Sequence, residues 1–229
     1  MIIDFPDYQA NNDSHYEITM NTSIMELNNF ENAKEQALLA MDELTGWCSK
    51  FKAAILMDLI LQKKAKTVVE IGVWGGKSLI PMAFAIKSLT NGKVYGIDPW
   101  SNAESALGMN GVNQEWWGKV DHEAIYQNLV QKINKFNLQN TVSLIRATSK
   151  NASPIAGIDV LHIDGNHSEE ASFLDVQKWV PLVSSGGLII FDDTTWGTTA
   201  RAVNWLNENC TKMKDYHDEA NDWGIWIKS

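Results

Sequence analysis

Apolar side chains recur along most of this chain in two rhythms, one typical of helices and the other typical of buried strands. Between positions 31 and 64 the period is about 3.6 residues, which predicts two helices separated at Gly46. From position 67 onwards, short apolar runs alternate with helical patterns. The runs predict strands at 67–71, 93–98, 141–146, 158–163, 187–191 and 224–228, with helices at 78–89, 121–136, 169–180 and 198–209.

Strands that are apolar throughout and alternate with helices indicate a parallel sheet covered on both faces. The sequence therefore predicts a doubly wound α/β domain over residues 31–229. Residues 1–30 are polar and weakly patterned, which predicts an N-terminal arm or a cap laid over a site. Residues 100–120 are rich in Asn, Gly and Trp and are predicted to form an insertion.

The composition narrows the possible partners. The 229 residues include 19 basic and 28 acidic side chains, and the net charge is −9 at pH 7. This excess of acid argues against binding nucleic acid or an anionic membrane through an overall positive field. No apolar run reaches the roughly 20 residues of a membrane-spanning helix, and the first residues do not form a signal peptide pattern. We therefore expect a small-molecule substrate, with no nucleic acid or membrane partner.

The two cysteines bear on the redox state of the cellular compartment. Cys48 and Cys210 lie far apart and form no CxxC pair, which speaks against a disulfide scaffold or a cysteine-rich zinc site. Unpaired cysteines are typical of a reducing compartment. We expect a soluble cytoplasmic protein, either alone or as a homo-oligomer.

The glycine-rich loop after the first predicted strand, residues 70–78 (EIGVWGGKS), is the main candidate ligand site, because parallel sheets bind ligands at the carboxyl ends of their strands. A dinucleotide fingerprint would need glycines where Trp74 and Lys77 stand. The end of the loop matches a phosphate-binding P-loop, but the leading glycine would fall at Ile71, so the loop is one residue too short. A nucleotide hydrolase is kept as an alternative.

S-adenosylmethionine fits this loop better, because its reacting end carries no phosphate and requires glycines at the chain reversal with an acid nearby. Glu70, Gly72 and Gly76 supply these groups. Asp98 ends the second predicted strand, where an acid can accept hydrogen bonds from ribose hydroxyls. Thr148 follows the third strand, where an adenine would lie. Together these positions predict a binding site for S-adenosylmethionine.

A second cluster of polar residues follows the fourth and fifth predicted strands. Asp164 ends one of them, and Asp192 and Asp193 end the other. Neighbouring strands lie about 4.8 Å apart, so we expect the three carboxylates to be close together. Such a cluster requires a cation, a proton or a basic group, and oxygen ligands favour Mg²⁺, then Mn²⁺ or Ca²⁺. The alternatives are a helix cap at 192–193 and a turn at Asp164.

Residues 69–78 resemble the first motif of class I methyltransferases. With the segments 161–170 and 186–193, the chain is similar to the metal-dependent O-methyltransferases typified by macrocin and other sugar O-methyltransferases, and to their cephalosporin-hydroxylase-like relatives. The resemblance covers about residues 63–196. It implies a mostly parallel, seven-stranded, Rossmann-like sheet and methyl transfer to a hydroxyl of a sugar, phenol or natural product. Trp74, Ser78 and Asp164 are then further candidates for contacts with the methyl donor.

The same resemblance implies roles for the second cluster. Asp164, Asp192 and Asp193 would bind a divalent metal, and His167 would act as the general base. Two departures bear on these roles: relatives often carry Glu-Asp at positions 192–193, and some carry an Asp where Asn166 stands, which can serve as the base instead. A non-catalytic domain that binds S-adenosylmethionine is a further alternative.

The remaining histidines and the tryptophans of the insertion carry weaker signals. His162 lies inside an apolar strand and is predicted to be a core residue. Three other histidines are predicted to lie on the surface: His15, His122 and His217. Three indoles of the insertion could stack on a flat acceptor or simply pack as part of a lid: Trp100, Trp116 and Trp117.

Overall fold

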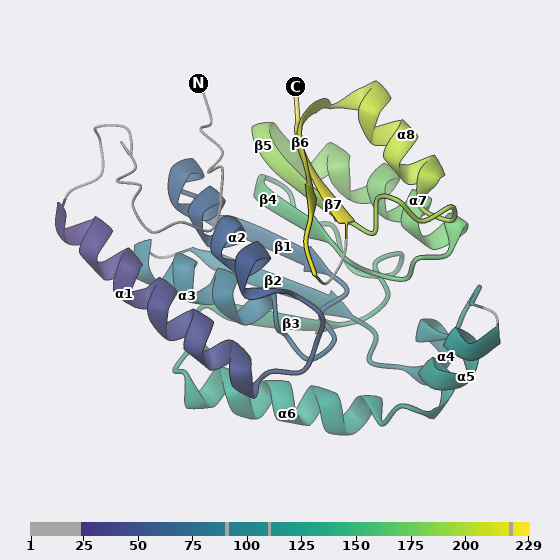
Figure 1. The fold of residues 1–229 in the computed structure, drawn as a ribbon, viewed down its shortest axis with the longest axis horizontal. Coiled ribbons are helices and arrows are strands. Elements are labelled where there is room, and N and C mark those ends of the chain that lie inside the picture. Colours follow the sequence, from purple (N-terminus) through teal and green to yellow (C-terminus); the bar gives the residue numbers. More distant parts are fainter. Residues whose placement is uncertain (1–23, 90–91, 110, 220–221) are drawn as a thin grey trace.

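The centre of the molecule is a seven-stranded sheet in the order β3-β2-β1-β4-β5-β7-β6 (Figure 1). The computed structural model describes residues 24–89, 92–109, 111–219 and 222–229. The strands are β1 (Thr67–Ile71), β2 (Lys93–Asp98), β3 (Val142–Arg146), β4 (Ile158–Ile163), β5 (Val183–Asp192), β6 (Thr211–His217) and β7 (Asp222–Ile227). Strands β1 to β5 pair in parallel, whereas β7 is antiparallel to both β5 and β6. The predicted doubly wound, mostly parallel sheet is confirmed.

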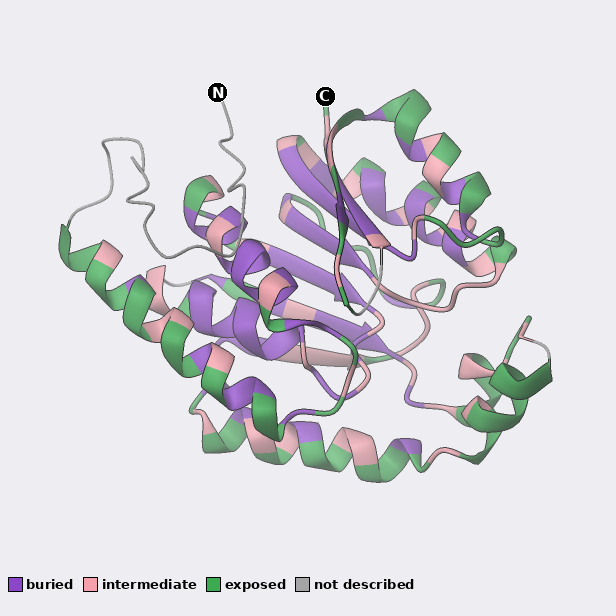
Figure 2. Cartoon of the chain, in the orientation of Figure 1, coloured by how far each residue is buried: buried purple, intermediate pink, exposed green. Residues whose placement is uncertain are grey.

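Helices cover both faces of the sheet, so the central strands are buried almost throughout (Figure 2). One face packs against α1 (Ile24–Ala40), α2 (Lys50–Lys63), α3 (Leu79–Leu89) and α6 (His122–Lys135), and the other against α7 (Glu169–Trp179) and α8 (Ala200–Asn209). Successive strand residues alternate between the two faces, so that Val68 belongs to the first core and Val69 to the second. This alternation later decides where the polar strand residues point.

Three features differ from the predicted elements by more than two residues. Strand β6 was not predicted, because its sequence alternates exposed lysines with few buried side chains, as is typical of a sheet edge. Strand β5 begins at Val183, four residues earlier than expected. Helix α1 begins at Ile24, so the predicted arm over residues 1–30 overlaps it. Residues 1–23 of that arm, with His15, lie outside the described residues.

The insertion after β2 contains two short helices, α4 (Asn102–Ser105) and α5 (Gly111–Lys119), which lie beyond the carboxyl edge of the sheet (Figure 1). The Asn102 side-chain amide joins its two ends by donating to the carbonyls of Gly118 and Val120, at 3.0 and 2.8 Å. Asn166, after β4, donates to the carbonyl of Leu107 at 2.9 Å. The insertion therefore bridges two loops at this edge. Within the described part of the chain, no helix combines the length and apolarity that crossing a membrane requires.

Candidate active site

The loops after β1 and β4 meet at the point where the strand order reverses, which is where open α/β sheets bind their ligands. Gly72 has a φ of +83°, and a Cβ at this position would lie 1.9 Å from the Asp164 carbonyl oxygen. Gly76 has a φ of +81°, and its Cβ would lie 2.4 Å from Leu129 Cδ1. Only glycine allows this backbone conformation together with such close approach. Gly72 thus brings the glycine-rich loop against the backbone of Asp164, and Gly76 brings it against α6.

Asp98 holds the glycine-rich loop from the end of β2. Its Oδ2 accepts hydrogen bonds from the backbone N–H groups of Val73 and Trp74, at 3.0 and 2.9 Å, and its Oδ1 accepts one from Trp100 at 2.7 Å. Burial raises the pKa of Asp98, although these N–H groups oppose the shift. Because a carboxylate has about four acceptor sites, Asp98 can hold the loop and still accept a bond from a ligand.

Indole rings surround the outer side of this loop. Trp74 has a φ of +52°, a left-handed conformation that is uncommon for a bulky side chain. Its ring lies 4.9 Å from that of Trp117, 5.7 Å from that of Trp116 and 5.8 Å from that of Trp47. Trp47 and Trp116 are 58% and 44% exposed, so the cluster faces solvent on one side.

One prediction for this region is wrong, and one of two alternatives is decided. His122 was predicted on the surface but is buried, because the rings of Trp74 and Trp117 cover it at 5.5 and 6.0 Å. Trp100 was a candidate for stacking on an acceptor, but it is 2% exposed and packs against Tyr126. Trp100 still supports the glycine-rich loop, because its indole N–H donates to the carbonyl of Trp74 at 2.9 Å, whereas the pair on α5 contacts the Trp74 ring.

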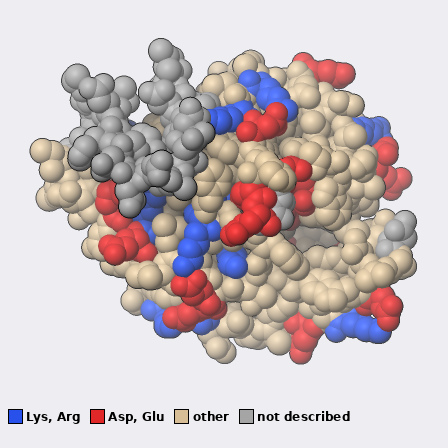
Figure 3. Space-filling model, in the orientation of Figure 1, with Lys and Arg blue, Asp and Glu red and all other residues tan. Residues whose placement is uncertain are grey.

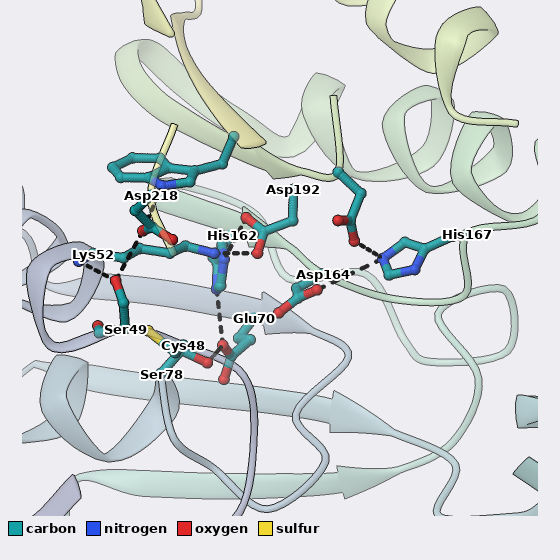
Figure 4. A network of polar contacts seen from close by, with 12 residues as sticks. Cys48, Ser49, Lys52, Glu70, Ser78, His162, Asp164, His167, Asp192 and Asp218 are labelled. Atoms are coloured by element: carbon teal, nitrogen blue, oxygen red, sulfur yellow. Dashed lines mark hydrogen bonds and ion pairs between the residues drawn. The ribbon is translucent and has the colours of Figure 1, made fainter. Parts of the chain in front are cut away.

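A network of buried charged side chains connects Asp192 to Glu70 (Figure 4). Lys52 of α2 forms an ion pair with Asp192 Oδ2. His162 Nε2 lies 3.2 Å from Asp192 Oδ1, and His162 Nδ1 lies 2.8 Å from Glu70 Oε1. Ser78 donates its hydroxyl to the same Glu70 oxygen at 2.5 Å. These contacts connect the predicted donor residues Glu70 and Ser78 to Asp192.

The strand register explains why these side chains meet. Glu70 of β1 lies opposite His162 of β4, and His162 lies opposite Ile190 of β5. Asp192 is two residues beyond Ile190, so it points to the same face of the sheet. Helix α2 covers that face and brings Lys52 to the carboxylate. His162 is confirmed as a core residue, but its partners, and Lys52 itself, were missed.

The pairing decides the charges in this network. Burial favours the neutral amine of Lys52, but the Asp192 carboxylate outweighs burial and raises the pKa of Lys52. Burial also disfavours the charged ring of His162, yet Asp192 and Glu70 raise its pKa to about 9. The two cations in turn lower the pKa of Asp192 despite its burial. Each buried cation therefore contacts a carboxylate: Lys52 contacts Asp192, and His162 contacts both Asp192 and Glu70.

A second group of polar side chains lies on the open side of the cluster. His167 Nε2 is 2.8 Å from Asp193 Oδ2 and 3.7 Å from Asp164 Oδ1. Burial opposes protonation of His167, but the two carboxylates raise its pKa to about 10. Burial and the neighbouring Asp192 raise the pKa of Asp164. The ring of Trp196, which sequence patterns did not single out, lies 5.1 Å from that of His167.

These side chains fit a divalent cation. One ligand atom each from Asp164, His167 and Asp193 lies within 4.8 Å of the others. In the protein as described, the His167 imidazolium supplies the positive charge that the carboxylates require. A cation among the same atoms would replace that charge, which is the arrangement expected of oxygen ligands around a hard ion. Asp192 also approaches Asp164, in a group with His162, but both of its oxygens contact buried cations.

A pocket lies at the carboxyl edge of the sheet, beside the insertion rather than at the acids themselves. This pocket, of about 820 Å³, lies beside the end of β2, lined by residues 99–103 and 118–123 and by Arg146. On the face drawn in Figure 3 the surface is hollowed right of centre, and the acidic and basic side chains around it are interspersed rather than gathered by sign. Among the described residues on this face, basic side chains form no continuous positive surface (Figure 3).

Thr148, predicted near an adenine, lies in the turn after β3, where its hydroxyl oxygen accepts a hydrogen bond from Asn151 N–H at 3.2 Å. The adjacent Ser149 donates its hydroxyl to Asp175 of α7. Burial raises the pKa of Asp175 to about 7. Helix α7 thus holds this turn through a carboxyl group that is protonated more readily in the folded protein.

We expect Asp175→Asn to stabilise the protein at pH 7 but not at pH 4. With its pKa raised above the ordinary value, folded Asp175 binds more protons than the unfolded chain between about pH 4 and pH 7, so stability falls as pH rises through this window. Asparagine removes this loss and can still accept the Ser149 bond. Melting temperatures measured across the window test this, with exposed Asp42→Asn as control. A difference between Asp175→Asn and the parent that is independent of pH would contradict it.

The segment that carries these features matches a known family. Residues 69–194 match the family described as a methyltransferase domain. The chain belongs to this methyltransferase family. The matched part of the methyltransferase domain begins in β1 and ends just beyond Asp193, so it contains the glycine-rich loop, Asp98 and the acids of both strands.

Relatives of the methyltransferase domain are distant. The uncharacterized protein R132 of Acanthamoeba polyphaga mimivirus is 33% identical over 134 residues, which are 58% of this chain and 53% of that protein. The match thus spans about half the length of this relative.

Solved structures confirm the class I methyltransferase fold. The O-methyltransferase NovP has a TM-score of 0.65 at 14% identity, over 89% of this chain and 99% of NovP. TomG from Streptomyces achromogenes, an O-methyltransferase solved with S-adenosylmethionine, has a TM-score of 0.59 at 14% identity, over 86% and 89% of the two chains. An O-methyltransferase from Bacillus cereus, solved with S-adenosylhomocysteine, has a TM-score of 0.57 at 14% identity, over 93% and 94%.

Proposed function

We propose that this chain is an S-adenosylmethionine-dependent O-methyltransferase, assisted by a divalent metal and acting on a hydroxyl of a small molecule such as a sugar, phenol or natural product. The observation that carries this proposal is the contact between Gly72 and Asp164, because it sets the glycine-rich loop directly against the acids. A methyl donor in the loop would then lie beside an acceptor at the acids. TomG and the Bacillus cereus enzyme, solved with the donor or its product, support the choice of donor.

The donor would lie along the predicted residues at the ends of the first strands: Glu70, Gly72, Trp74, Gly76, Ser78, Asp98, Thr148 and Asp164. Glu70 Oε2 is buried and has no hydrogen-bond partner among the described residues. A buried acceptor without a partner is costly, so a donor group of the ligand would be favoured there. The ammonium of S-adenosylmethionine is such a group.

Asp164 and Asp193 would hold the metal, Mg²⁺ or alternatively Mn²⁺ or Ca²⁺, with Asp192 as the third acid that the resemblance implies. A bound cation would supply the positive charge that makes an acceptor hydroxyl more acidic. His167 would accept the hydroxyl proton at Nε2, once neutralisation of the surrounding carboxylates allows its ring to be neutral. The acceptor oxygen would attack the methyl carbon in line as the carbon–sulfur bond breaks, leaving S-adenosylhomocysteine.

Two alternatives are distinguished by binding and turnover. Family membership disfavours the nucleotide hydrolase, and thermal shift measurements should show stabilisation by S-adenosylhomocysteine but not by ATP with Mg²⁺. Stabilisation by ATP alone would overturn the proposed function. A non-catalytic domain would bind the donor yet transfer no methyl group to a panel of sugars, phenols and other hydroxylated molecules. Transfer of labelled methyl groups to such a panel tests this directly.

We expect Asp98→Ala to weaken S-adenosylhomocysteine binding at least tenfold. The substitution removes both the anchor of the loop and an acceptor for ribose hydroxyls, and hydrogen bonds to a charged group contribute about 1.5–3 kcal/mol each. Calorimetric titration measures the loss. An analogue lacking the ribose 2′-hydroxyl separates the two roles: the parent should discriminate against it, whereas Asp98→Ala should not. Unchanged affinity in Asp98→Ala would contradict the ribose assignment.

A further inference from the structure

Lys52 has no role in the function proposed above, yet its environment is unusual. It is the only buried lysine among the residues that the structure describes, with 0% of its surface exposed. Removing an ammonium group from water is unfavourable unless an anion of good geometry compensates. The compensating anion is Asp192, whose exposed fraction is 1%. The pair joins α2 to the end of β5, 140 residues apart in the sequence.

The two acids that follow β5 face different surroundings. Asp192 is the last residue of the strand and points toward α2, where Lys52 and His162 contact its two oxygens (Figure 4). Asp193 follows in a left-handed conformation, with a φ of +52°, and its carboxylate contacts His167 on the open side. The backbone therefore separates two adjacent carboxylates into an inner one and an outer one.

We propose that Lys52 is a positioning residue whose ammonium is the permanent counter-ion of Asp192. It holds this carboxylate turned toward α2, so that Asp164 and Asp193 are the acids available to a cation at the open edge. The statement about the cation rests on the proposed function, whereas the pairing of Lys52 with Asp192 does not. The inference departs from the resemblance, which implies that all three acids are metal ligands.

The geometry supports this assignment, because Lys52 contacts Asp192 Oδ2 while His162 Nε2 lies 3.2 Å from Asp192 Oδ1, so both carboxylate oxygens are occupied. A metal ion bound to Asp192 would compete with two cations that are already in place. The Asp193 carboxylate contacts His167, and among the described residues no lysine competes with a metal ion for it. Asp192, the inner carboxylate, therefore suits a structural role, and Asp193, the outer one, suits a metal ligand.

A double-mutant cycle tests the pairing. Lys52→Met leaves Asp192 buried without its counter-ion and should lower the melting temperature by about 10 °C. Combining it with Asp192→Asn removes both charges at similar volume and should restore most of that loss. Lys34→Met is a matched control, because the Lys34–Asp58 pair, at 2.6 Å, is partly exposed and lies away from the acids, so its loss should cost less. Additive effects of Lys52→Met and Asp192→Asn would overturn the proposal.

Manganese titration by calorimetry tests the consequence for the cation. The folded double variant should bind Mn²⁺ within about threefold of the parent affinity, whereas Asp193→Asn should bind at least tenfold more weakly. A folded double variant that loses Mn²⁺ affinity tenfold or more would make Asp192 a ligand and overturn the proposal. If the parent itself binds no Mn²⁺, the metal of the proposed function fails, and the double-mutant cycle alone decides the role of Lys52.

Discussion

Methyl transfer by this chain should stop when divalent metal is removed completely. Without the metal, no cation at Asp164 and Asp193 makes an acceptor hydroxyl more acidic. The two carboxylates then hold the pKa of His167 at about 10, so its ring is protonated. A protonated ring cannot accept a proton, so both the activated acceptor and the base are lost together. Transfer of labelled methyl groups, measured after exhaustive chelation and again after adding back Mg²⁺, Mn²⁺ or Ca²⁺, tests this expectation.

Binding of S-adenosylhomocysteine is the internal control for this experiment. The contacts of Asp98 and Gly72 that hold the donor loop are made by or to the backbone and need no metal, so chelation should change the affinity for S-adenosylhomocysteine little. Full methyl transfer in excess EDTA would show that the metal is not required. Loss of donor binding on chelation would instead indicate a general change in the fold.

We expect His167→Ala to lower kcat by roughly 10²–10⁴-fold, the usual contribution of a general base. The His167 Nε2 atom lies 2.8 Å from the Asp193 carboxylate and 3.7 Å from that of Asp164. A hydroxyl bound at these two acids would be within its reach. Affinity for the donor and for the metal should change little. The measurements are kcat and KM for the acceptor, together with calorimetric titration of Mn²⁺.

The matched control is His217→Ala, which removes an exposed histidine paired with Asp222 at the far edge of the sheet. This variant should retain normal kcat. A large loss of Mn²⁺ affinity in His167→Ala would identify His167 as a ligand rather than a base. Near-normal kcat at neutral pH would exclude it from the mechanism.

The parallel part of the sheet could be predicted because its strands are buried on both faces and so are apolar throughout. β1, for example, spans the predicted residues 67–71. The edge strand β6 has a different requirement: most of its side chains face water, and only Tyr216 is buried. Its alternating lysines therefore resemble a loop or an exposed helix as much as a strand. Burial on one side only leaves too weak a pattern for assignment.

The site was predicted as far as it depends on strand ends. Glycines, Asp98, Asp164 and Asp193 lie where the chain leaves the sheet, and parallel strands place their ends at one edge. Lys52 could not be found in this way, because a lysine in the first turn of a helix normally reaches solvent and its partner is 140 residues away. His122 was misplaced for a similar reason, since the rings that bury it come from the insertion and the glycine-rich loop.

The insertion over residues 100–120 would also affect how long a ligand bound at this edge stays on the protein. It is fastened by Asn166 on one side and by indole contacts with Trp74 on the other, and both attachments lie at the edge where the donor would bind. If a bound nucleoside-sized molecule lies beneath the insertion, its release would require one of these attachments to open. Departure of the spent donor, rather than chemistry, would then limit turnover, as in enzymes whose lids open slowly. Residues that never touch the ligand would govern its residence time.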